Sequence, residues 1–154
     1  MIYMISDHAG YNLKQSIIQF LFSINLDVKD LGTYSSESVD YPDYAFKLGE
    51  AITTSKCNDV WGIAICGTGI GMSIALNKVK NIQAALIHND FTALHAKTHN
   101  NANVICIGAR LNTYSETVKM INTFMHAKFE LGTNHERRIE KIKKYEGEHY
   151  GKCS

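Results

Sequence analysis

Short apolar runs alternate with helical stretches along most of this chain, and this alternation limits its possible folds more than any other feature. Apolar runs of strand length occupy residues 2–5, 26–31, 60–66, 84–87 and 104–107. After the first run, Leu13, Ile17 and Leu21 recur at helical spacing, and helical stretches follow the other runs. This order predicts an α/β fold, a doubly wound (Rossmann-like) sheet of five parallel strands with right-handed crossovers and a C-terminal helix.

The order of these strands decides which loops meet. We expect the order 2-1-3-4-5, which reverses between the first and the third strand. Ligands of such sheets bind at this reversal, beyond the carboxyl ends of the strands. Asp7 and His8 follow the first strand, and the glycine-rich residues 66–71 follow the third. These two loops are therefore expected to lie side by side.

Length and composition indicate a single domain that acts on small molecules. We expect one domain over residues 1–154. The 16 Lys and Arg nearly balance the 15 Asp and Glu, which argues against a broad nucleic-acid or membrane-binding surface. No apolar run approaches the roughly 20 residues that span a bilayer, and residues 1–6 lack the basic start of a signal peptide.

The cysteines indicate the compartment. Four are present without a CxxC pair: Cys57, Cys66, Cys106 and Cys153. Together with the missing export signal, this pattern predicts free thiols in a reducing cytoplasm.

Residues 66–71 read Cys-Gly-Thr-Gly-Ile-Gly. Three glycines in five positions can expose successive backbone N–H groups without a Cβ in the way, which predicts an anion-binding nest between a strand and a helix. The dinucleotide fingerprint GxGxxG would need glycine at Met72, and an ATP-binding P-loop would need Lys-Ser or Lys-Thr after its last glycine. Neither a dinucleotide nor ATP is therefore expected.

Cys66 begins this nest. Amide dipoles stabilise a thiolate, and a thiolate beside an oxyanion site can act as a nucleophile or as a general base. The alternative is an inert, buried cysteine at the end of a strand. Cys57, Cys106 and Cys153 have no such nest, and no chemistry is expected of them.

His95 and His99 lie four residues apart on a predicted helix, as zinc ligands often do. Ala96 stands where the HExxH motif has its glutamate, and no third ligand is suggested, so no metal site is expected. The His99 imidazole, in a polar stretch before the fifth strand, could exchange protons near neutral pH. Its alternative role is to stabilise the carboxyl end of the helix.

Three other polar residues have two possible roles each. Asp7 and His8 could contact a ligand or only form a turn, and Arg110 could hold a phosphate or pair with surface carboxylates. On a helix over about residues 135–145, Ile139, Ile142 and Tyr145 share one face. We expect this face to dock on the domain or, as a homo-oligomer would require, on a second subunit.

Five motifs in order carry a resemblance to a known family. They occupy residues 6–10, 40–45, 66–75, 99–104 and 108–110. Together they closely resemble the type B ribose-5-phosphate isomerases and the related galactose-6-phosphate isomerase subunits. The resemblance runs from about residue 2 to residue 142.

This resemblance implies an aldose–ketose isomerase that needs no metal or organic cofactor. It implies that Cys66 moves a proton between C1 and C2 of ribose 5-phosphate and that His99 helps to open the sugar ring. It also implies dimers or tetramers with a site built across two subunits. The substrate-binding residues that it implies are Asp7, His8, Tyr41, Gly67, Thr68, Gly69, Ile70, Gly71, Asn100, Arg110 and Arg138. Among these, His8, Arg110 and Arg138 would contact the phosphate.

The tail departs from the family pattern, which has two phosphate-binding arginines. Arg138 matches the second, but Asn134 replaces the first, so that Arg137 could be its substitute. Two alternative functions stay open at this point. One is isomerisation of a phosphohexose such as galactose or allose 6-phosphate, and the other is phosphosugar binding without catalysis, because a fold alone does not fix function.

Overall fold

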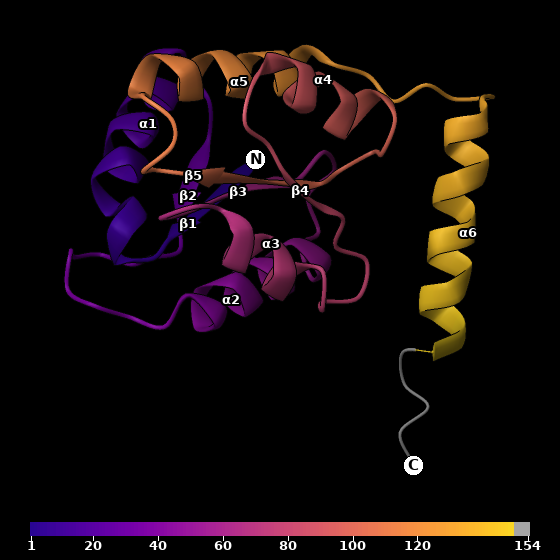
Figure 1. Cartoon of the computed structure of the whole chain (residues 1–154), viewed down its shortest axis with the longest axis horizontal. Coiled ribbons are helices and arrows are strands. Elements are labelled where there is room, and N and C mark those ends of the chain that lie inside the picture. The colour runs from indigo at the N-terminus through magenta and orange to yellow at the C-terminus, as the bar shows by residue number, and fades with distance from the viewer. Residues whose placement is uncertain (150–154) are drawn as a thin grey trace.

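The structure is a computed structural model that describes residues 1–149, so Cys153 lies outside the described residues. Its middle layer is a sheet of β1 (Ile2–Ser6), β2 (Val28–Asp30), β3 (Trp61–Cys66), β4 (Ala84–Leu86) and β5 (Val104–Gly108). Helices α1 (Tyr11–Ser23), α4 (Asp90–Thr98) and α5 (Tyr114–His126) cover one face, and α2 (Tyr41–Thr53) and α3 (Ile70–Leu76) cover the other (Figure 1). All strand pairs are parallel, which confirms the predicted doubly wound α/β fold.

The strand order is β2-β1-β3-β5-β4, so the last two strands are exchanged relative to the expected 2-1-3-4-5. All five residues of β5 are buried between two neighbouring strands, whereas the three residues of β4 are half-buried at the edge. Both runs are short and apolar, which is why the sequence did not separate them. The reversal between β1 and β3 is where it was expected.

Alternate residues of the central strands face opposite helix layers. Ile63 and Ile65 pack with the α1, α4 and α5 side, while Ala64, Cys66 and Cys106 belong to the second apolar cluster, toward α2 and α3. Burial raises the pKa of the Cys106 thiol, so this cysteine is inert as expected, and Cys57 is exposed. Both are free thiols.

Helix boundaries follow local signals. Pro42 lies in the first turn of α2, as predicted. Asn89 and Thr113 are N-caps of α4 and α5, and each forms a capping box with the residue three positions later. A short 3-10 helix, η1 (His8–Gly10), joins β1 to α1.

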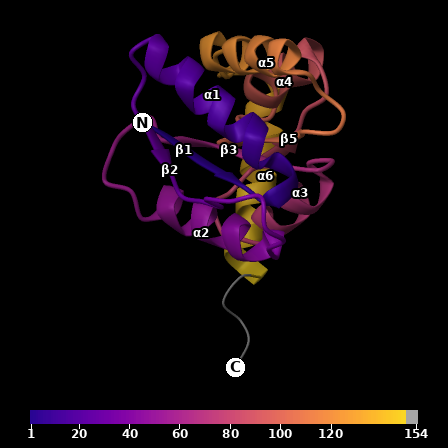
Figure 2. The same cartoon turned by 90° about the vertical axis from the view of Figure 1, so that its left-hand side faces the viewer.

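The predicted C-terminal helix is α6 (Asn134–His149), and it stands apart from both helix layers, beside the β4 edge (Figure 1). Turned by 90°, the molecule shows α6 running across the sheet edge, from the side of α4 toward that of α2 (Figure 2). Ile139 is buried, but Ile142 and Tyr145 are exposed. None of the helices over residues 1–149 is long and apolar enough to cross a membrane.

Candidate functional site

The glycine-rich loop places its first residue against a backbone donor. The amide of Gly69 donates to Cys66 Sγ at 3.1 Å, and Cys66 is only 5% exposed at the end of β3. Gly69 has a φ of 79°, which favours glycine, and a Cβ there would come within 2.6 Å of Leu86 Cδ1. The loop can therefore hold its N–H groups beside the sulfur only with glycine at this position.

Asp7 and His8, which follow β1, lie at the same carboxyl ends of the strands as Cys66. The Asp7 amide donates to the Ile65 carbonyl at 3.1 Å, which fixes this loop beside the end of β3. The Asp7 carboxylate caps η1 by accepting from Gly10 N at 3.0 Å, so the turn-forming reading of Asp7 is correct in this structure. His8 Nδ1 accepts from Val39 N at 3.3 Å.

Arg110 and Tyr41 close the other sides of the loop. The Arg110 amide donates to the Gly67 carbonyl at 3.0 Å, and its guanidinium lies 3.1 Å from where a Cβ of Gly67 would stand. The Tyr41 ring would lie 2.7 Å from a Cβ of Gly71. Thr68, Ile70 and Gly71 complete the loop, and the exposed Thr68 and Ile70 leave it open to solvent.

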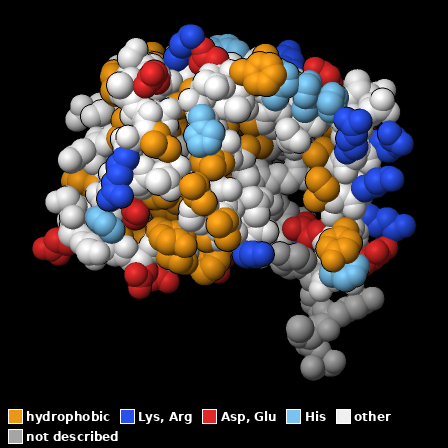
Figure 3. All heavy atoms as spheres, viewed as in Figure 1, with side chains coloured by type: hydrophobic (Ala, Val, Ile, Leu, Met, Phe, Trp, Pro, Cys, Tyr) orange, Lys and Arg blue, Asp and Glu red, His pale blue; other side chains and the backbone are white. Residues whose placement is uncertain are grey.

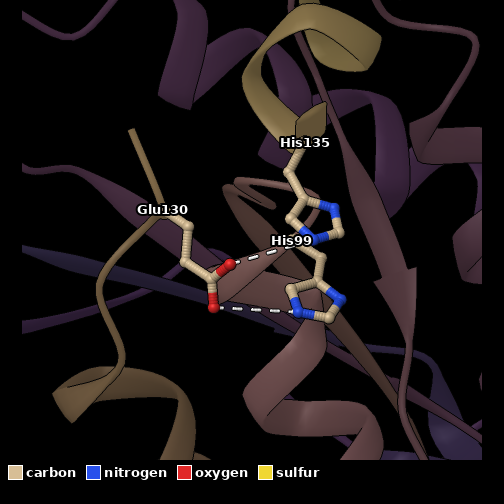
Figure 4. Close-up of side chains that lie close together, drawn as sticks. All are labelled: His99, Glu130 and His135. Carbon is tan, nitrogen blue, oxygen red and sulfur yellow. Dashed lines mark ion pairs between the residues drawn. The ribbon is translucent and has the colours of Figure 1, made fainter. Parts of the chain in front are cut away.

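His99, by contrast, belongs to a second cluster. It caps the carboxyl end of α4 and stacks on His135 of α6 with 3.8 Å between ring centroids, while Glu130 reaches both rings (Figure 4). Partial burial and the neighbouring His135 and His95 lower the pKa of His99. The His99 ring is therefore neutral, and able to accept a proton, at neutral pH.

Other expected residues lie with this second cluster. The Asn100 side chain donates to the His95 carbonyl at 2.9 Å. Arg138, on α6, is close enough for its charge to act on His99. Arg137 Nη2 donates to Asn134 Oδ1 at 3.2 Å, so these two tail residues lie together.

The two clusters lie at opposite ends of the parallel strands. Helix α4 runs antiparallel to the strands, so His99, which directly follows α4, lies at the amino ends of the strands. Asn103, four residues later, marks this end, because its carbonyl accepts from Gly62 N at the start of β3 at 2.9 Å. Cys66, four residues after Gly62, lies at the carboxyl ends of the strands, about 13 Å from Gly62 at a rise of 3.3 Å per residue. A single copy of this chain therefore does not bring Cys66 and His99 together.

A groove of about 460 Å³ separates α6 from the β4 edge. Figure 3 shows it as the hollow between the body of the protein and this helix. Its lining is mostly apolar and includes Ile82, Ala84, Ala85, Ile139, Ile142 and Tyr145.

Comparison with known proteins decides the family. The family model described as Ribose/Galactose Isomerase matches residues 2–142. The chain belongs to the ribose/galactose isomerase family. The resemblance inferred from the five motifs is thereby confirmed.

Relatives in this family match nearly the whole chain. A protein of Mycoplasma genitalium named a probable ribose-5-phosphate isomerase B is 44% identical over 148 residues, 96% of each chain. The ribose-5-phosphate isomerase B of Escherichia coli is 36% identical, covering 88% of this chain and 89% of the relative. The solved M. genitalium ribose-5-phosphate isomerase B with bound ribulose 5-phosphate has a TM-score of 0.90 at 43% identity, covering 96% of each chain.

Sequence reasoning missed Glu130 and His135 as neighbours of His99. They come from the loop before α6 and from its first turn, more than 30 residues further along the chain. No local pattern links them to His99. Only the placement of α6 beside the end of α4 brings the three together.

Proposed function

We propose that this chain interconverts ribose 5-phosphate and ribulose 5-phosphate. The family, the names of its relatives and the ribulose 5-phosphate bound to the M. genitalium protein support this substrate. The observation that carries the proposal is the Cys66 sulfur held against the Gly69 amide at the edge of a glycine-rich loop. That arrangement suits removal of a proton from carbon next to a carbonyl.

In the proposed mechanism the Cys66 thiolate removes the C2 proton of the open-chain aldose, breaking the C–H bond and forming S–H. The electron pair moves toward the carbonyl oxygen, and backbone N–H groups of residues 67–71 stabilise the resulting enediolate. Losing one such donor lowers rates by about 10²–10³ in other enzymes. The O2 hydroxyl proton then passes to O1, and return of the carbon proton from the Cys66 S–H to C1 forms the C2 carbonyl of the ketose and regenerates the thiolate.

We propose that a second copy of the chain completes this site. His99 would open the sugar ring, but within its own chain it lies at the amino ends of the strands, opposite Cys66. The His99 beside Cys66 must therefore come from a partner subunit. Asn100 and Arg138 would arrive with it. The substrate would then lie between Asp7, His8, Tyr41 and Arg110 of one subunit and these three residues of the other.

The apolar face of α6 supports a homo-oligomer, a dimer or a tetramer, because Ile142 and Tyr145 are exposed in the single chain. We expect Ile142→Asp to shift the assembly toward monomers, since a buried carboxylate without a partner destabilises an interface. Light scattering at micromolar concentration measures the mass. Lys144→Asp, on the opposite face of α6, is the control and should keep the wild-type mass. A monomeric wild-type protein would contradict the shared site.

The reach of one family model over residues 2–142 supports a single catalytic domain. The free thiols of Cys57, Cys66 and Cys106 suit the cytoplasm as its compartment.

The test of the proposed function is turnover of purified protein on ribose 5-phosphate, compared with allose 6-phosphate and galactose 6-phosphate. We expect the highest kcat/KM on the pentose phosphate. Preference for a hexose phosphate would reassign the substrate within the family. Binding of all three sugars without turnover would leave a phosphosugar-binding protein and contradict the proposal.

A further inference from the structure

His99, Glu130 and His135 form a compact group of metal-ligating side chains. One ligand atom from each residue, a ring nitrogen of each histidine and a carboxylate oxygen of Glu130, lies within 4.8 Å of the other two. The side chains come from the end of α4, the loop after α5 and the first turn of α6. Two histidines and one carboxylate are a ligand set that borderline divalent cations favour.

The distances fit a shared cation better than direct hydrogen bonds. His99 Nε2 lies 3.8 Å from Glu130 Oε1, and His135 Nε2 lies 3.8 Å from Glu130 Oε2, which is too long for a hydrogen bond. Two ligands that bind one zinc ion tetrahedrally, each about 2.0–2.1 Å from it, stand roughly 3.3 Å apart. A shift of about half an ångström would bring each His–Glu pair to this separation, and a turn of one stacked ring would bring the two imidazole lone pairs to one point.

The two imidazole rings lie face to face beside the Glu130 carboxylate (Figure 4). Their planes are nearly parallel, at 7°, with 3.8 Å between ring centroids, so the in-plane Nε2 lone pairs run side by side. One ring must therefore turn about its side-chain torsions before both nitrogens can bind one cation. The side chains of His99 and His135 are 32% and 24% exposed, so a cation can enter from solvent. The positive charge of Arg138 near His99 opposes the cation and should keep the affinity moderate.

We propose that His99, Glu130 and His135 form a site for a divalent cation of the zinc class and that the cation acts as an inhibitor. Binding would occupy the Nε2 lone pair of His99, the residue that the proposed function assigns to ring opening. Only the inhibition rests on the proposed function, because the ligand geometry stands without it.

The test is isothermal titration of the full-length protein with ZnCl₂. Wild type should bind about one zinc ion per chain with a micromolar dissociation constant, and Glu130→Gln should weaken this binding by at least about tenfold. Glu140→Gln, which makes the same change of charge on α6 where Glu140 pairs with Lys143, is the control and should bind as wild type. Equal binding by wild type and Glu130→Gln would overturn the proposal.

Initial rates on ribose 5-phosphate provide the second measurement. Zinc should inhibit wild type and Glu140→Gln alike, and Glu130→Gln should need at least about tenfold more zinc for the same inhibition. Equal zinc sensitivity of Glu130→Gln would mean that zinc acts elsewhere, for example on the Cys66 sulfur, and would overturn the inhibitory role. Zinc binding that depends on Glu130 in a protein without turnover would leave the site intact and contradict the proposed function instead.

Discussion

Replacing Cys66 by alanine is expected to lower kcat on ribose 5-phosphate by about 10²–10⁴-fold, because the substitution removes the proposed general base. KM should change little, since the side chains proposed to hold the sugar and the phosphate remain. Cys66 is small and lies at the end of β3, so alanine keeps most of the local packing. Steady-state rates together with circular dichroism separate loss of the base from loss of the fold.

Two cysteines of the same chain provide controls for this prediction. Cys57→Ala should keep wild-type rates, because Cys57 is exposed and precedes β3, whereas the glycine-rich loop follows the far end of that strand. Cys106 is buried and its pKa is raised, so iodoacetamide should not reach it in the folded protein. Alkylation that inactivates a variant lacking both Cys57 and Cys153 as fast as it inactivates wild type would implicate Cys66. Equal turnover of wild type and Cys66→Ala would remove Cys66 as the base.

Mixing two impaired variants is expected to restore activity. In a two-fold symmetric dimer, the partner of a Cys66→Ala chain can be a His99→Ala chain. One of the two sites then holds intact Cys66 from one subunit and intact His99 from the other, while the second site lacks both. Random reassociation makes half of the dimers mixed, with one working site each, so about a quarter of the wild-type rate should return.

This recovery distinguishes a shared site from a site within one chain. If Cys66 and His99 of the same chain acted together, every site in the mixture would lack one of them, and the rate would remain the average of the two variants. Subunits are mixed by co-expression with two affinity tags, and the doubly tagged dimers purified from the mixture should reach about half of the wild-type rate, since one of their two sites works. Doubly tagged dimers of Cys66→Ala with wild type should show about half of the wild-type rate under both models and are the control for the tags.

Much of this fold could be predicted from the sequence because its signals are local. The apolar run ending at Cys66 gave a central strand, and Pro42 marked the first turn of α2. The loops after β1 and β3 meet as expected, because β1 lies between β2 and β3 in the sheet. Which strand lies on the other side of β3 depends on tertiary packing. The sequences of β4 and β5, both short and apolar, do not show which of the two pairs with β3.

The candidate site was predictable only in part for a related reason. Asp7, His8, Tyr41 and Arg110 gather around the glycine-rich loop because each lies beside the carboxyl end of a strand or at a helix start facing it. The resemblance assigned His99 to the same site, but within one chain His99 lies at the opposite ends of the strands from Cys66. The resemblance implies a site built across two subunits, but no sequence pattern states which subunit supplies a side chain. The separation of His99 from Cys66 within one chain is visible only in three dimensions.

The central claim is that the Cys66 sulfur carries a proton between two carbon atoms of a pentose phosphate. Proton NMR of ribose 5-phosphate with the enzyme in D₂O tests it most directly, by following deuterium that enters C1 of the ribulose 5-phosphate formed. We expect wild type to incorporate deuterium during turnover and Cys66→Ala to lose both incorporation and turnover together. Incorporation by Cys66→Ala at the wild-type rate would contradict the account.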